Sequence, residues 1–271
     1  MRKQRREAKP LVLVHGLKNQ YRWSKSFLRS LSKHWDGPIY LIFTNPTAPI
    51  HTLKLKEKTI FSIGKNSCTA GTQSISVQTQ RVAEKIQILQ EHCGLGNHFH
   101  LIGHSMGGLI SRKYAYDYPD TVQNIVTLGT PHQGTPLIDR FSWLGWIAGG
   151  LPAFRDLKTA SLTRFNKVYP PEFTPLHAGG EILTMRGITK GIIRKKWGSL
   201  GEELIGWYSM RLRDNIKKSD GLVPASAAVM EGTKHIADFP GDDHMALVRK
   251  PKVARELACC LQEQQQTTVE S

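Results

Sequence analysis

Short apolar runs alternate along the chain with stretches in which apolar residues recur at helical spacing. From Ile75 to Leu89 apolar side chains share one helical face, and Gly94 follows as a stop; another helical stretch begins at Pro251. Strand–helix alternation predicts a mostly parallel sheet with helices on both faces. The runs predicted to be strands are 11–14, 39–43, 99–102, 122–128, 182–185 and, more weakly, 235–239.

Two longer segments interrupt this alternation. The first, about 132–180, holds aromatic and aliphatic residues among glycines and prolines, and the second, about 187–218, holds Trp197 and Trp207. Both fall between expected strands, so both should lie at the loop edges of the sheet. We predict a single α/β domain over residues 1–271, with about six strands, a cap or lid insertion and a second insertion.

One pentapeptide stands where a strand should turn sharply into a helix. Gly103-His104-Ser105-Met106-Gly107 follows the run 99–102 and opens into the helix-like stretch 108–118. This is the setting in which G-x-S-x-G forms a nucleophile elbow, with glycines where side chains would collide with neighbouring backbone. The pattern predicts that Ser105 is a nucleophile.

Acyl transfer to a serine needs backbone N–H groups that stabilise the developing oxyanion. The residue after the nucleophile, Met106, is one expected donor. The loop after the first strand, His15-Gly16-Leu17, offers Leu17 as the second, with Gly16 allowing a close approach. We expect His15 to shape this loop rather than to transfer a proton.

The serine also needs a histidine base and a carboxylate that orients it. In hydrolases with this elbow the chain order is serine, acid, histidine. His244 is in a loop just after the last predicted strand, whereas His235 is within that strand. We therefore predict His244 as the base and Asp220, in a polar turn, as the acid. Asp214 is the fallback acid, and Asp242 and Asp243 are expected to cap a loop.

Five segments together resemble the bacterial triacylglycerol lipases and the related inositol-deacylase-like lipases of the α/β-hydrolase superfamily. The resemblance runs in that family's order from residue 11 to about 260. It implies the α/β-hydrolase fold, with Ser105, Asp220 and His244 as the triad and Leu17 and Met106 as the oxyanion amides. The segments are LVLVHGL (11–17), GHSMGGL (103–109), LGTPHQGTP (128–136), SDGLVP (219–224) and DDHMAL (242–247).

The same resemblance implies a lid over an acyl-binding groove, here Phe141–Phe154 between Arg140 and Arg155. Aromatic and basic side chains of this kind suit a membrane interface. The alternative is a packed cap helix that never opens. The expected lid and substrate-contacting residues are Phe141, Trp143, Leu144, Trp146 and Ile147.

Charge and cysteine content add expectations about partners. With 37 basic and 22 acidic residues the net charge is +15, which means either a solvated basic surface or peripheral contact with an anionic membrane. No nucleic-acid module accompanies the charge, so no nucleic-acid partner is expected. Four cysteines without C-x-x-C spacing favour free thiols. The apolar run 11–14 is too short for a secretory signal, and no apolar stretch reaches about 20 residues. We therefore expect a cytoplasmic protein, either free or peripheral on a membrane.

Three functions stay open from the sequence. The first is a carboxylic ester hydrolase, a lipase or esterase acting on acyl lipid. The second is an acyltransferase or thioesterase that uses the same acyl-enzyme. The third is a non-catalytic basic membrane- or polyanion-binding protein on a hydrolase scaffold. We expect neither a cofactor nor a metal. His98 and His100 share a strand face and could hold a metal, although polar packing at a strand end is favoured.

Overall fold

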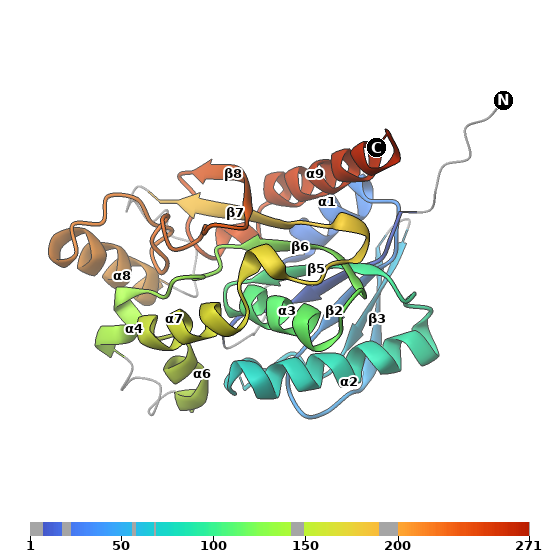
Figure 1. The fold of residues 1–271 in the computed structure, drawn as a ribbon, viewed down its shortest axis with the longest axis horizontal. Coiled ribbons are helices and arrows are strands. Elements are labelled where there is room, and N and C mark those ends of the chain that lie inside the picture. The colour runs from blue at the N-terminus through green and yellow to red at the C-terminus, as the bar shows by residue number, and fades with distance from the viewer. Residues whose placement is uncertain are drawn as a thin grey trace.

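An eight-stranded sheet forms the centre of the computed structural model (Figure 1). The structure describes residues 8–17, 23–55, 58–67, 69–141, 149–189 and 200–270. The strand order is β3-β4-β2-β1-β5-β6-β7-β8, and every neighbouring pair is parallel except β3 and β4. The fold is therefore the predicted mostly parallel α/β sheet.

Six of these strands coincide with the six apolar runs of the sequence. They are β1 (Leu11–Val14), β2 (Ile39–Ile42), β5 (Phe99–His104), β6 (Val122–Leu128), β7 (Ile182–Ile188) and β8 (Lys234–Pro240). The other two, β3 (Ile50–Leu55) and β4 (Lys58–Ile63), form an antiparallel pair at the sheet edge. Side chains of β3 are exposed or half-buried, so this edge strand lacks the apolar run by which the others were predicted.

Helices cover both faces of the sheet, as predicted. Along β1, Leu11 and Leu13 pack into a core beneath α1 (Lys25–His34) and α9 (Pro251–Glu270). Val12 and Val14 pack into a second core, with α2 (Ile75–Cys93) and α3 (Met106–Asp117). This alternation follows from the two-residue period of a strand. Figure 1 shows α1 and α9 side by side on one face and α2 and α3 on the other.

Short helices occupy the two regions that interrupt the alternation. Between β6 and β7 lie α4 (Pro136–Phe141), α6 (Leu151–Asp156), α7 (Thr159–Val168), η1 (Pro171–Phe173) and η2 (His177–Gly179); α8 (Leu200–Arg213) precedes β8 and η3 (Ala246–Val248) follows it. In Figure 1, α4, α6, α7 and α8 gather at the end toward which β7 and β8 point.

The predicted lid is only partly within the described residues. Phe141 ends α4 and is half-buried. Trp143, Leu144, Trp146 and Ile147 lie outside the described residues, as does Trp197 of the second insertion. Within the described part of the chain, no helix is both long enough and apolar enough to cross a membrane.

Candidate active site

Ser105 sits on a strained turn between β5 and α3. Its backbone has φ 54° and ψ −128°, a region that non-glycine residues rarely adopt. The turn is held because the Ser105 N–H donates to the Leu128 carbonyl at 2.9 Å. α3 begins at the next residue, Met106, so the unpaired amides of its first turn lie beside the serine.

The glycines of the elbow are required by close backbone contacts. A Cβ on Gly103 would lie 2.4 Å from the Cα of Gly108, and one on Gly107 would lie 2.3 Å from the Val14 carbonyl oxygen. Both distances are far below any real carbon contact, and backbone atoms cannot move aside as a side chain can. The helix can therefore start directly beneath Ser105 only with glycine at these positions.

The loop after β1 passes directly over the serine. A Cβ on Gly16 would lie 2.6 Å from the Ser105 Cβ and 3.2 Å from its Oγ. His15 is buried and holds this loop: its Nδ1 donates to the Gly16 carbonyl at 2.7 Å, and its Nε2 accepts from the Thr44 amide at 3.0 Å. Because the peptide bond is trans, the Leu17 N–H points away from that fixed carbonyl.

Asp220 and His244 form a buried pair. The His244 Nδ1 donates to the Asp220 Oδ2 at 2.6 Å, and both residues are almost completely buried. The other carboxylate oxygen, Oδ1, accepts the amides of Leu222 and Val223 at 3.0 and 2.8 Å. Three hydrogen bonds thus hold the Asp220 carboxylate, and one of them fixes the His244 ring through Nδ1.

Two residues that support this pair were not predicted from the sequence. Gly129 follows β6 with φ 58°, and a Cβ there would lie 2.9 Å from the Asp220 Oδ2 and 3.1 Å from the His244 Nδ1. His104 donates from Nε2 to the His244 carbonyl at 3.1 Å, with the two ring centroids 4.6 Å apart. Both lie inside quoted motifs, but their contacts with the pair join residues far apart in the chain, which the motifs do not reveal.

The alternative acids and bases have other partners. Asp214 pairs with Arg140 at 2.8 Å and so links α8 to α4. Asp242 pairs with Lys250 and Lys252, and the Asp243 Oδ1 accepts the Ala246 amide at 2.7 Å. His235 contacts Thr184 and Asp238 at the sheet edge. These contacts leave Asp220 as the carboxylate that contacts His244.

The segment LGTPHQGTP packs beneath the start of α3. A Cβ on Gly108 would lie 2.2 Å from the Thr130 Oγ1. His132 is fully buried, contacts the Thr127 hydroxyl at 3.2 Å and has its carbonyl held by Asn166. Burial and nearby Arg112 hold the pKa of His132 well below its ordinary value, so this ring is neutral and structural.

Two surface hollows, of about 440 and 480 Å³, are lined by residues other than Ser105, Asp220 and His244.

Comparison with known proteins assigns the family. A family model described as palmitoyl protein thioesterase matches residues 10–170, more than half of the chain. The chain belongs to this family. As a member of the palmitoyl protein thioesterase family, it falls among the lipase-, esterase- and thioesterase-type hydrolases that the motifs indicated, and the matched range contains the whole elbow.

Solved structures support the α/β-hydrolase fold of this family member. Mature Bacillus licheniformis lipase BlEst2 is 18% identical, with a TM-score of 0.65 over 94% of this chain and 92% of that one. Phospholipase PlaB from Legionella pneumophila is 17% identical, with a TM-score of 0.62 over 94% of this chain and 59% of that one. An α/β-hydrolase fold protein from Chitinophaga pinensis is 13% identical, with a TM-score of 0.51 over 94% of this chain and 89% of that one.

Curated relatives match over a short stretch. Proteins named triacylglycerol lipase from Pseudarthrobacter phenanthrenivorans and Burkholderia plantarii are each 51% identical over 39 residues. That stretch is 14% of this chain and only 12% and 11% of the two relatives. The chain therefore matches these relatives over a small part of their length.

Proposed function

We propose that the protein hydrolyses acyl esters through an acyl-enzyme on Ser105. The observation that supports this most strongly is the buried Asp220–His244 pair, in a chain whose Ser105 occupies a strained elbow at a helix N-terminus. A buried histidine with a carboxylate on Nδ1 is the arrangement that makes Nε2 a base toward a serine hydroxyl.

In the first half-reaction, the Ser105 Oγ attacks the acyl carbonyl carbon and its proton passes to the His244 Nε2. Asp220 stabilises the resulting imidazolium, which remains hydrogen-bonded to it through Nδ1. The Met106 and Leu17 amides are the proposed donors to the oxyanion. Collapse of the tetrahedral intermediate breaks the bond to the leaving group, which takes the proton from His244.

In the second half-reaction, water attacks the acyl-enzyme and His244 accepts its proton. The same amides stabilise the second oxyanion. The bond from the acyl carbon to the Ser105 oxygen then breaks, the serine recovers its proton from His244, and the carboxylic acid leaves. Each half-reaction returns His244 to its neutral form, so the cycle needs neither cofactor nor metal.

An acyl lipid is the proposed substrate class. Leu17, Met106 and Ala153 of α6 belong to one apolar cluster, and a Cβ on Gly150, just before α6, would lie 3.9 Å from the Leu17 Cδ1. This supports an acyl chain lying along that side of the serine. Two relatives bear the name triacylglycerol lipase and one similar structure is called a phospholipase. The lid over Phe141–Phe154 stays a prediction.

A thioester is the second candidate substrate, favoured by the family match over residues 10–170. The proposed mechanism serves both classes because the leaving group departs before water enters. A thiolate leaves more readily than an alkoxide, so deacylation would limit thioester turnover. Acyl transfer to an alcohol is a further variant of the same second half-reaction.

Matched substrates test these alternatives. The purified full chain is offered an oxoester and a thioester with the same acyl chain, at several chain lengths, with Ser105→Ala as the control. The proposal expects turnover of at least one class, rising with chain length and absent in Ser105→Ala. Added alcohol separates hydrolysis from transfer, since a transferase would form the new ester. Equal rates for wild type and Ser105→Ala would contradict the proposal.

The proposed place of action is the cytoplasm, with peripheral contact with an anionic membrane. The net charge of +15 supports that contact. Free thiols at Cys93, Cys259 and Cys260 fit a reducing compartment. Co-sedimentation with vesicles tests the contact: binding should need anionic lipid and weaken as salt is raised.

A further inference from the structure

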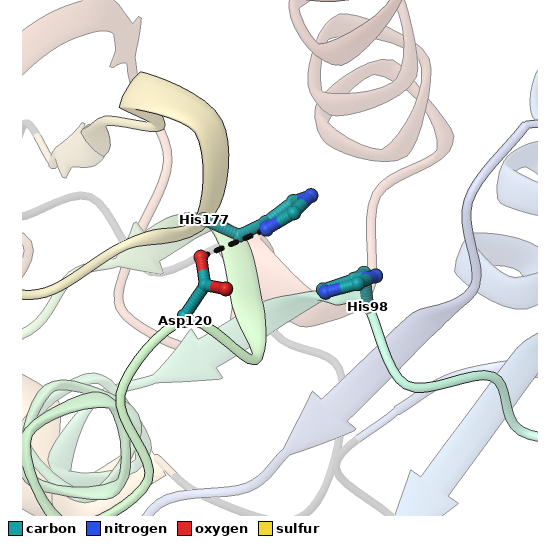
Figure 2. Close-up of side chains that lie close together, drawn as sticks. All are labelled: His98, Asp120 and His177. Atoms are coloured by element: carbon teal, nitrogen blue, oxygen red, sulfur yellow. Dashed lines mark hydrogen bonds and ion pairs between the residues drawn. The ribbon is translucent and has the colours of Figure 1, made fainter.

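Three side chains capable of binding a metal converge at the end of the sheet where β5, β6 and β7 begin. Figure 2 shows His98, Asp120 and His177 together. One donor atom from each lies within 4.8 Å of the other two. The rings of His98 and His177 have centroids 3.7 Å apart, and the His177 Nδ1 lies 2.9 Å from the Asp120 Oδ1. None of the three contributes to the proposed hydrolysis.

Each residue comes from a different loop, and the three loops lead into neighbouring strands. His98 immediately precedes β5, Asp120 comes just before β6, and His177 begins η2 ahead of β7. In the sheet, β5, β6 and β7 are adjacent, so the cluster is built by strands about 4.8 Å apart. It therefore brings together residues that are far apart in the sequence.

Backbone hydrogen bonds fix these loops. The Asp120 amide donates to the Pro175 carbonyl at 3.1 Å, which ties the second loop to the third. The Gly180 amide donates to the His177 carbonyl at 3.1 Å and closes η2. Asp120 itself has φ 61°, a left-handed conformation that aspartate adopts more readily than most residues. The donor atoms are thus held near one another by the scaffold.

We propose that His98, Asp120 and His177 form a binding site for a divalent transition metal of the zinc class. Two imidazoles and one carboxylate are ligands that suit zinc, nickel, copper or cobalt rather than calcium or magnesium. A tetrahedral zinc ion holds its nitrogen and oxygen donors about 3.3 Å apart. On binding, the more widely separated donor atoms would move closer together, and the His177 Nδ1 and Asp120 Oδ1, now 2.9 Å apart, would separate slightly. Both histidines are only half-buried and Asp120 is exposed, which leaves room for this movement and for water as a fourth ligand.

The site differs from the His98–His100 pair that the sequence offered as an alternative to polar packing. His100 is buried within β5, packs edge-to-face against Trp35 and faces away from solvent, so it is not a partner of His98. Ser105 follows the opposite end of the same strand, about 20 Å away by the rise of β5 (Phe99–His104). The metal would therefore join three loops and stabilise the fold, with no direct part in the chemistry.

Calorimetric titration of Zn²⁺ into the full chain, freed of any affinity tag, tests the proposal. Wild type should bind one zinc ion, and His98→Ala, His177→Ala and Asp120→Asn should each lower the affinity by about tenfold or more. His92→Ala is the matched control, because His92 is an exposed histidine beside a carboxylate, Glu91, elsewhere on the surface. It should bind zinc as wild type does.

A second measurement separates loss of the site from loss of the fold. Excess zinc should raise the melting temperature of wild type and His92→Ala and leave that of His177→Ala unchanged. Covalent labelling of Ser105 should be equal in all these proteins, so failure of the metal site and failure of the proposed hydrolysis are distinguishable. Zinc affinity that is absent from wild type, or unchanged in His98→Ala and His177→Ala, would overturn the proposal.

Discussion

The Asp220 carboxylate lies 2.6 Å from the Nδ1 of His244, and both side chains are shielded from solvent. Two segments far apart in the chain are also joined here through the backbone, because the His244 amide donates to the Asp220 carbonyl at 2.9 Å. This double link fixes both the position and the tautomer of the histidine. It makes the pair rigid without help from substrate.

Replacing Asp220 with Asn should preserve the shape of the pair and remove its charge. The amide can no longer stabilise an imidazolium, and it favours the wrong tautomer of His244. We expect kcat for ester hydrolysis to fall by about 10³- to 10⁴-fold, with the circular dichroism spectrum unchanged. Asp214→Asn is the control, since that residue pairs with Arg140 instead. Similar activities for the two variants would argue against Asp220 as the acid.

Gly16→Ala should displace the loop that carries Leu17, a proposed oxyanion donor, and so slow the reaction. The added methyl would lie 2.6 Å from the Ser105 Cβ and 2.9 Å from the His104 carbonyl oxygen, so the loop that carries Leu17 must move away. Losing one oxyanion donor typically costs about 10²-fold in kcat. Gly96→Ala is the matched control, because a Cβ there meets no atom within 4 Å and the backbone is not left-handed. A fully active Gly16→Ala would contradict the assigned loop.

His104 should act as a positioning residue for His244. Its Nε2 donates to the His244 carbonyl at 3.1 Å. One such hydrogen bond is worth about 1 kcal/mol, so His104→Ala should lower kcat by roughly fivefold. His104→Gln retains a donor and should recover part of the loss. A purely structural role would instead lower the melting temperature of both variants and leave kcat per folded molecule unchanged.

The buried His100 should make the fold sensitive to acid. Burial, with a smaller effect of Lys9, lowers the pKa of His100 to about 3. Below the ordinary value of about 6.5 the unfolded chain binds a proton that the folded chain does not, so stability falls as pH drops from there toward 3. The loss amounts to at most about 5 kcal/mol. His100→Phe should flatten this part of the wild-type curve in urea unfolding at several pH values. Parallel curves for the two proteins would show that His100 is not the sensitive group.

The residues of the proposed active site could be selected from the sequence because their signals are local. A strand, a sharp turn and a helix identify Ser105 within one short segment, and chain order then selects Asp220 and His244. The edge hairpin β3–β4 was not predicted. The side chains of β3 are exposed or half-buried, and only Ile60 and Ile63 of β4 are fully buried, so neither strand carries a long apolar run. Nor was the role of His104, because its contact joins residues 140 positions apart.

The cluster of His98, Asp120 and His177 could not be predicted either, because it joins residues that are far apart in the sequence. From the sequence, the nearest partner of His98 was His100, two residues away on the same predicted strand. Only the order of β5, β6 and β7 in the sheet brings His177 and Asp120 to His98. Contacts set by sheet order cannot be inferred from spacing along one strand.

Covalent labelling with a fluorophosphonate probe, mapped by peptide mass spectrometry, tests most directly whether Ser105 is an activated nucleophile. Wild type, Ser105→Ala, His244→Ala and Asp220→Asn are compared with lipid present. We expect wild type to be labelled on Ser105, Ser105→Ala to remain unlabelled, and the other two variants to react far more slowly. A folded wild type that resists the probe, or one labelled at another serine, would contradict this expectation.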